Sequence, residues 1–237
     1  MNRFLARAGV ASRRAADALI ASGAVQVNGK RPPKDGMLID PDADAVTVDG
    51  DEVHPPRSHR YLLLNKPAGV MVTASDPEGR PTVFDLLDDA GPGRLFPVGR
   101  LDMATSGLLF LFDDGALAHR LTHARFGVPK EYIATVAGVP TEADIRHLRT
   151  GVTLEDGRTA PAQADLIQSG PGPRAEVKIV IREGRNRQVR RMLEAVGHPV
   201  TDLVRVGFGP IRLGRLKSGT WRRLRPAEID ALMRAAE

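Results

Sequence analysis

Hydrophobic and polar positions alternate in several segments of the chain, and each of these segments predicts a β-strand. Residues 24–30 and 44–53 alternate around an Asn-Gly and an Asp-Gly dipeptide, both typical of tight hairpin turns. Apolar or alternating runs predict further strands over 60–70, 106–115, 130–138, 174–184, 202–214 and 219–226.

Helical periodicity and capping residues predict the helices between these strands. Ser12 is a typical N-cap for a helix that ends at Gly23, and Asn186 is the N-cap expected for a helix that ends at Gly197. Further helices are expected over 3–9, 116–123, 141–151 and 227–236, and residues 81–87 resemble a helix start.

Strands and helices are mixed without a regular β-α-β rhythm, which favours an α+β fold. We expect a small helix-plus-hairpin module with its linker over residues 1–57. A mixed, mainly antiparallel sheet flanked by helices is expected over 58–237. The prolines of residues 54–60 mark the linker, and residues 88–94 are predicted to form a loop.

The distribution of charge changes this picture more than the modest net charge of +5 does. Residues 1–34 carry seven Lys or Arg and one acidic residue. Residues 35–57 carry one Arg and seven acidic residues. Residues 174–225 carry fourteen Lys or Arg and four acidic residues. Two basic blocks suggest a polyanionic partner, of which nucleic acid is the commonest, although each block is also compatible with an ordinary solvated surface.

Composition excludes several kinds of site. The chain has no Cys, which rules out disulfides, thiolate metal sites and Cys nucleophiles and fits a reducing compartment. No apolar run approaches the roughly 20 residues that span a bilayer, and the N-terminal stretch does not resemble a secretory signal. We therefore expect a cytoplasmic protein with no membrane association.

Cofactor and metal signatures are also missing from the sequence. There is no phosphate-binding GxxxxGK[ST] motif, and the glycines at 207–214 do not have dinucleotide-binding spacing. His119 and His123 are four residues apart on a predicted helix, but they lack the adjacent Glu of a zinc protease. We expect no cofactor and no metal.

Several polar residues are candidates for chemistry. Asp102 lies in the turn of VGRLDMATSGLL, just before an apolar strand, and Tyr132 is one of only two tyrosines in the chain. The segment REGRNRQVRRM places arginines at a helix N-terminus, where free N–H groups favour anions. Three interpretations of these arginines are open: they bind a phosphate, they pair with a buried carboxylate, or they are ordinary solvated side chains. Tyr132 either fills the core or stacks on a base.

Four segments together resemble one family. NKPAGVMVTASD, VGRLDMATSGLLFLFDDGALAHRLTH, KEYIATVAG and REGRNRQVRRMLEAVGHPV resemble the RsuA/RluB group of bacterial ribosomal RNA pseudouridine synthases, in order and spacing, over about residues 60–225. The N-terminal unit looks like the alpha-L RNA-binding module of this family. Details such as LVRVGFGPIRLGRL are most similar to the large-subunit, RluB-like branch. Ser106 and Asp113 occupy positions where other members often carry Glu and Asn.

The resemblance implies an isomerase that converts a specific uridine of ribosomal RNA, expected to be 23S rRNA, to pseudouridine. It implies that Asp102 is the catalytic aspartate, that Tyr132 lies against the flipped uracil and that Arg190 is the basic partner of Asp102. A buried carboxylate without a cation would tend to protonate. Phosphate contacts are expected from Arg3, Arg7, Arg13, Arg14, Arg100, Arg185 and Arg187, and with weaker support from Lys66 and Lys130.

Two other classes of protein stay open at this point. A non-catalytic rRNA-binding factor of ribosome assembly explains both basic blocks, but it leaves Asp102, Tyr132 and Arg190 unexplained as a set. An RNA hydrolase would use Asp102 with His119 or His123 as acid and base. The expected partner is rRNA, either naked or in an assembly intermediate, and the expected state is a monomer. The sequence does not identify the modified uridine.

Overall fold

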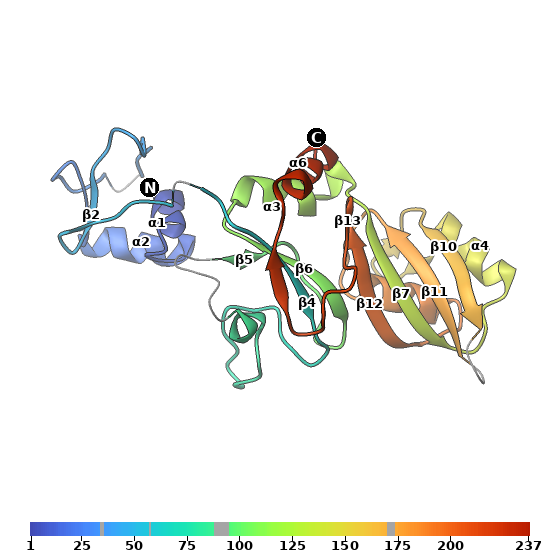
Figure 1. The fold of residues 1–237 in the computed structure, drawn as a ribbon. Coiled ribbons are helices and arrows are strands. Elements are labelled where there is room, and N and C mark those ends of the chain that lie inside the picture. Colours follow the sequence, from blue (N-terminus) through green and yellow to red (C-terminus); the bar gives the residue numbers. More distant parts are fainter. Residues whose placement is uncertain (34–35, 57, 88–94, 170–173) are drawn as a thin grey trace. The chain divides into compact units, whose positions relative to one another are not determined.

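The computed structural model describes residues 1–33, 36–56, 58–87, 95–169 and 174–237 (Figure 1). The chain divides into two compact units, Met1–Arg60 with Asp89–Phe96, and Tyr61–Asp88 with Pro97–Glu237. The predicted loop at 88–94 and residue 57, the predicted end of the N-terminal domain, lie outside the described residues. Within the described ranges, no helix combines the length and hydropathy needed to cross a bilayer.

The first unit consists of two helices and a small sheet. The Ser12 hydroxyl accepts a hydrogen bond from the Ala15 amide at 3.1 Å, and Gly23 ends the helix in a left-handed conformation, as predicted. The elements are α1 (Asn2–Arg7), α2 (Arg13–Ser22), β1 (Val25–Val27), β2 (Val46–Val48) and β3 (Asp51–Glu52).

Both predicted tight turns are present in this unit. Asn28 and Asp49 adopt positive φ angles of 51° and 52°, and a glycine with positive φ follows each of them. Strand β1 pairs with β2 and β2 pairs with β3, both antiparallel. A small core holds the unit together and contains Phe4, Leu5, Ala16, Val25, Val27 and Val46.

The second unit is built on one mixed sheet with the order β10-β11-β7-β12-β6-β4-β14. Neighbouring strands are antiparallel except for β12 and β6, which confirms the expected mainly antiparallel sheet. The strands are β4 (Tyr61–Lys66), β5 (Phe96–Pro97), β6 (Ser106–Phe112), β7 (Lys130–Ala137), β8 (Thr153–Leu154), β9 (Gly157–Arg158), β10 (Gln163–Ser169), β11 (Arg174–Ile181), β12 (Val200–Phe208), β13 (Ile211–Arg212) and β14 (Trp221–Arg223).

Helices cover this sheet, and most lie where periodicity predicted them. The helix start expected at 81–87 is instead a single 3-10 turn, in which Thr82 and Asp85 form a capping box. Strand β10 was not predicted, because the adjacent residues Leu166 and Ile167 are both exposed and break the alternation. The helices are α3 (Gly115–Thr122), α4 (Glu142–Thr150), α5 (Gln188–Ala195) and α6 (Pro226–Ala235), with 3-10 turns at Val83–Leu86 and Ala124–Phe126.

Strand β6 is a buried interior strand of the sheet, and its start is unusually close to β12. A Cβ atom at Gly107 would lie 2.8 Å from the Arg205 backbone nitrogen and would also collide with the Arg205 carbonyl oxygen. The φ angle of Gly107 is +102°, so only glycine fits here without strain. Gly107 therefore makes room for the close approach of β12.

Candidate active site

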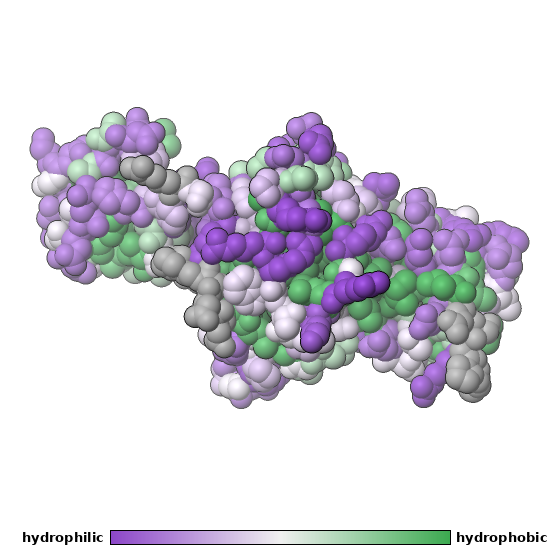
Figure 2. All heavy atoms as spheres, viewed as in Figure 1, coloured by the Kyte–Doolittle hydropathy of each residue, from purple (hydrophilic) through white to green (hydrophobic). Residues whose placement is uncertain are grey.

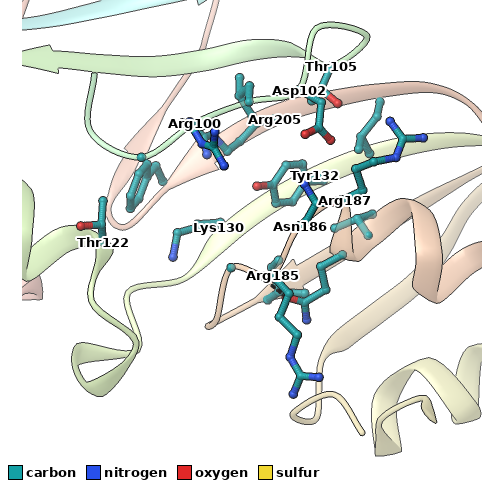
Figure 3. Close-up of a pocket in the computed structure, with 18 of the residues that line it drawn as sticks. Arg100, Asp102, Thr105, Thr122, Lys130, Tyr132, Arg185, Asn186, Arg187 and Arg205 are labelled. Carbon is teal, nitrogen blue, oxygen red and sulfur yellow. Dashed lines mark hydrogen bonds between the residues drawn. The ribbon is translucent and has the colours of Figure 1, made fainter. Parts of the chain in front are cut away.

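A cavity of about 330 Å³ opens in the second unit where the ends of several elements meet. Its walls come from the loop before β6, the starts of β7 and α5, the end of β11 and the middle of β12. Of the predicted site residues, the cavity brings together Arg100, Asp102, Lys130, Tyr132, Arg185 and Arg187 (Figure 3).

Asp102 lies on a loop that backbone hydrogen bonds hold in place. The Thr105 amide donates to the Asp102 carbonyl at 3.0 Å, and the Gly69 amide donates to the Met103 carbonyl at 2.8 Å. The Asp102 side chain is half-buried and forms no hydrogen bond with any residue of the described ranges. Its carboxylate points towards the Tyr132 side chain across the cavity (Figure 3). The carboxylate is therefore rigidly aimed and free to act on a ligand.

Lys66 lies beneath this loop rather than in the cavity wall. Its ammonium group donates to the carbonyls of Pro67 at 2.8 Å and Met103 at 3.3 Å, and the side chain is fully buried. Burial lowers the pKa of Lys66 to about 8, although the nearby Asp102 charge acts in the opposite direction. Lys66 thus fastens the loop and supplies positive charge behind the carboxylate.

Arg190 also holds the loop, which corrects our expectation of an ion pair with Asp102. Its guanidinium donates to the carbonyls of Ala104 at 2.9 Å and Val200 at 3.2 Å, and it forms no ion pair with Asp102. Burial, followed by repulsion from Arg187, lowers the pKa of Arg190, while the Asp102 charge raises it. Arg190 therefore affects Asp102 through the backbone and the local field.

Tyr132 faces the cavity because of the strand alternation of β7. Residues 130, 132, 134 and 136 are buried, and the residues between them are more exposed. Tyr132 is 7% exposed, and its hydroxyl forms no hydrogen bond with the described part of the chain. The ring is therefore available to a planar ligand.

Sequence reasoning missed Arg205, a buried cation in the cavity wall. Its side chain is 2% exposed, its Nε donates to the Leu108 carbonyl at 2.7 Å, and its Nη2 is buried without a partner. Lys130, which we had ranked low, is 9% exposed and donates to the Val128 carbonyl at 3.3 Å. The sequence did contain a signal for Arg205. It lies two residues after Leu203 on an apolar strand, so the two side chains share the inward face.

The arginines at the start of α5 have different environments. Arg187 is exposed and lines the cavity, and it is the N-cap with a positive φ of 46°, which corrects the expected Asn186 cap. Arg185 is less available for phosphate than predicted. Its guanidinium donates to the carbonyls of Asp156, Gly157 and Arg158 at 2.7–3.3 Å, so it supports the β8–β9 hairpin.

The predicted phosphate contacts of the first unit also differ in their availability. Arg3, Arg13 and Arg14 are exposed. Arg7 donates to the Pro56 carbonyl at 2.9 Å and is partly committed to that contact.

His119 on α3 and His123, the residue after it, lie outside the cavity wall. The rings of His119 and His123 are 5.1 Å apart between centroids, and both residues are exposed. Neither lines the cavity beside Asp102, which removes the geometric support for a histidine-assisted hydrolase. The described residues contain no group of three His, Cys, Asp or Glu side chains arranged to hold a metal ion.

A second groove lies between the β13–β14 segment and the start of α6. It has a volume of about 600 Å³ and belongs to the C-terminal basic block. Figure 2 shows hydrophilic side chains gathered over this region of the sheet. Glu228 pairs with Arg222 at 2.8 Å and Arg225 at 3.3 Å, whereas Arg215 has no ion pair with a described residue. The groove is thus basic, but its charges are mostly paired.

The main cavity combines groups that suit a nucleotide. A carboxylate faces an aromatic ring, and cations surround both of them. Aromatic rings stack on bases, arginines bind phosphates or carbonyl oxygens, and a carboxylate serves reactions at a glycosidic bond.

Comparisons with known proteins agree with this geometry. Residues 60–195 match the family described as RNA pseudouridylate synthase, and residues 2–31 match the S4 domain. A Bacillus subtilis protein named ribosomal large subunit pseudouridine synthase B is 41% identical, over 100% of this chain and 96% of its own length. An Aquifex aeolicus protein described as an uncharacterized RNA pseudouridine synthase is 42% identical, over 99% of this chain and 94% of its own length.

A solved structure shows the same architecture. The crystal structure of a pseudouridylate synthase aligns with a TM-score of 0.70 at 30% identity, over 98% of both chains. The family match spans residues 60–195, the part of the chain that carries Asp102 and Tyr132. The resemblance and the fold expected from the sequence are thereby confirmed. Because the family match spans more than half of the chain and these relatives align over nearly all of it, the chain belongs to the RNA pseudouridylate synthase family.

Proposed function

We propose that this RNA pseudouridine synthase isomerises a specific uridine of ribosomal RNA, with Asp102 as the catalytic carboxylate. The observation that carries the proposal is the placement of Asp102, whose carboxylate points into the cavity towards Tyr132 with no protein partner in the described ranges. Since the target uridine must leave its stack to enter a cavity, we propose that it is flipped onto the Tyr132 ring.

The reaction requires no redox step and no group donor. The N1–C1′ bond breaks, the uracil turns, and a C5–C1′ bond forms. Asp102 either attacks the sugar or stabilises an oxocarbenium-like species, and a carboxylate suits both tasks. In this proposal Lys66 and Arg190 act by fixing the loop through the Met103 and Ala104 carbonyls.

The proposed substrate is rRNA of the large subunit. Support comes from the relative named ribosomal large subunit pseudouridine synthase B and from the S4 match near the N-terminus. An rRNA substrate, naked or in an assembly intermediate, implies action in the cytoplasm. We also propose that the protein acts as a monomer. The proposed domains are residues 1–57 for RNA binding and 58–237 for catalysis.

The proposed exposed phosphate contacts are Arg100 and Arg187 at the cavity and Arg3, Arg13 and Arg14 on the first unit.

The proposal is tested by incubating the protein with transcribed large-subunit and small-subunit rRNA and mapping both pseudouridine and strand breaks. We expect one pseudouridine site, or a few, in large-subunit rRNA and no cleavage. Strand breaks would indicate a hydrolase, and binding without either product would indicate an assembly factor. Pseudouridine confined to small-subunit rRNA would contradict the proposed substrate but not the proposed chemistry.

A further inference from the structure

Two cations in the cavity wall have no anionic partner among the described residues. Arg205 is 2% exposed and its Nη2 is buried without a hydrogen bond, although its Nε is satisfied by Leu108. Lys130 is 9% exposed and its ammonium group uses one acceptor, the Val128 carbonyl. Their charged ends lie 5.1 Å and 5.2 Å from the centroid of the Phe208 ring. Buried donors without acceptors are costly, so this arrangement indicates a ligand with acceptor atoms.

The strand register places both cations around Tyr132. Arg205 lies directly opposite Tyr132 in the β7–β12 pairing, at a typical cross-strand separation of ~5 Å. Lys130 precedes Tyr132 by two residues, so the two side chains share a face and are separated by ~6.6 Å of strand. A planar base stacked on Tyr132 would therefore direct its edges towards both cations.

The burial of these cations distinguishes two kinds of acceptor. A phosphodiester of the RNA strand stays outside the cavity, where the exposed side chains of Arg100 and Arg187 can reach it. Arg205 and Lys130 are buried more deeply, where the base itself enters. The carbonyl oxygens of the base are therefore the acceptors that fit.

We propose that Arg205 and Lys130 bind the O2 and O4 carbonyl oxygens of the flipped uracil and stabilise the negative charge that develops on it during the reaction. This inference rests on the proposed function. When the N1–C1′ bond breaks, its electron pair goes to N1 and the charge spreads over O2 and O4. After the ring turns, C5 bonds to C1′, the C5 proton leaves, and N1 gains a proton. No oxidant, reductant or further reactant is needed.

Fixed cations suit this step because they face the charge where it develops and need no reorganisation. They also distinguish uracil from cytosine. Cytosine carries an amino group in place of O4, and that donor would face a buried cation without an acceptor. The same pair of residues thus accounts for both leaving-group stabilisation and base selection.

The test uses the full-length protein and an RNA that contains the mapped target uridine. Single-turnover rates at saturating RNA, RNA affinities and melting temperatures are measured for Arg205→Met, Arg205→Lys and Lys130→Met. Lys178→Met, which removes a partly exposed strand lysine outside the cavity, is the matched control. We expect each cavity Met variant to react about 10–100-fold more slowly, with affinity within about threefold of wild type. Arg205→Lys should recover part of the rate, and the control should match wild type.

Substrate analogues provide a test that does not depend on the folding of any variant. Sulfur accepts hydrogen bonds more weakly than oxygen, so 2-thiouridine or 4-thiouridine at the target should slow the wild-type enzyme. The thio effect should shrink in the variant that lacks the corresponding donor. If Arg205→Met does not fold, Lys130→Met and the wild-type thio effects decide the question.

Three results would overturn the inference. Unchanged rates in the cavity variants would show that the cations do not act on the base. Weakened affinity and a smaller salt dependence, with the rate restored by excess RNA, would instead assign them to a phosphodiester. Equal thio effects in wild type and variants would also contradict base contact. Failure of the proposed function has a different signature, because the wild-type protein would then form no pseudouridine.

Discussion

At the scale of single residues, the cations that support the Asp102 loop do not bind the Asp102 carboxylate itself. Lys66 and Arg190 both donate to carbonyl oxygens of the loop, those of Met103 and Ala104, and leave the carboxylate itself unbonded. The side chain is thus kept in place and kept accessible by the same two cations.

Arg190 can be distinguished from its neighbour Arg187 by kinetics. Arg190→Ala removes the donors to Ala104 and Val200, so we expect a loss of about 1–3 kcal/mol of stability. The single-turnover rate should fall, and added RNA should not restore it, while Arg190→Lys should recover part of it. Arg187→Ala, the matched control, should be rescued by saturating RNA. The reverse pattern would show that the two roles are exchanged.

Lys130 gives the reaction a predicted pH dependence. Burial, followed by repulsion from Arg205, lowers the pKa of Lys130 to about 8. The other charged or titratable groups that line the cavity are Arg100, Asp102, Tyr132, Arg185 and Arg187. The protonated fraction of Lys130 falls as pH rises through its pKa, so the rate should decline between about pH 7 and pH 9. Lys130→Arg keeps its charge, so its profile should decline less over this range, and the decline that remains is assigned to Lys66, whose pKa burial also lowers to about 8. An identical decline in both proteins would exclude Lys130 as the titrating group.

At the scale of elements, the sequence predicted helices and strands that depend on neighbouring residues, but not the pairing of distant strands. The uninterrupted apolar run of β6 predicted a strand, and the structure shows that its residues 107–112 are all buried. The start of α5 was placed at Asn186, but the Gln188 side chain accepts from the Arg185 amide at 3.0 Å and closes the helix without that cap. The parallel pairing of β6 with β12 joins distant segments, which no local pattern can reveal.

A substitution at Gly107 tests how strongly the pairing of β6 with β12 positions the site. Gly107→Ala would place a Cβ against the Arg205 backbone at a φ of +102°, and we expect a loss of at least about 2 kcal/mol of stability. Displacement of Arg205 should also lower the single-turnover rate of the protein that still folds. Gly79→Ala is the matched control, since Gly79 has a φ of +69° and open space around it. Equal melting temperatures for the two variants would contradict the close approach.

At the scale of the whole molecule, the sequence located most of the cavity but assigned some partners incorrectly. Asp102 and Tyr132 were predicted as a set, and the structure brings both to one cavity. Arg190 was assigned to the Asp102 carboxylate, whereas its partners are backbone carbonyls. Arg185 was assigned to phosphate, whereas it binds backbone carbonyls of the β8–β9 hairpin and pairs with Asp156 and Glu183. Arg205 was missed because its signal is a single polar residue in an apolar strand, which has meaning only once the strand order is known.

The charge of the first unit has a consequence that can be measured in the intact protein. Helix α2 has Arg13 and Arg14 in its first turn and no acidic residue there, so an anion would be favoured at this end. If both residues contact phosphate, Arg13→Gln with Arg14→Gln should lower the slope of log affinity against log salt by about 1.4–1.8. Arg146→Gln, on the exposed face of α4, should leave the slope unchanged. An unchanged slope in the double variant would assign this helix to another role.

Asp102→Asn is the most direct test of the proposed chemistry, because it keeps the size of the side chain and removes its charge. Pseudouridine formation at the mapped site is quantified at saturating rRNA for this variant and for Asp230→Asn, an exposed Asp on α6. We predict no detectable product from Asp102→Asn, with RNA affinity and melting temperature close to wild type, and normal turnover from Asp230→Asn. Pseudouridine formation by Asp102→Asn at the wild-type rate would contradict the assignment of Asp102 as the catalytic residue.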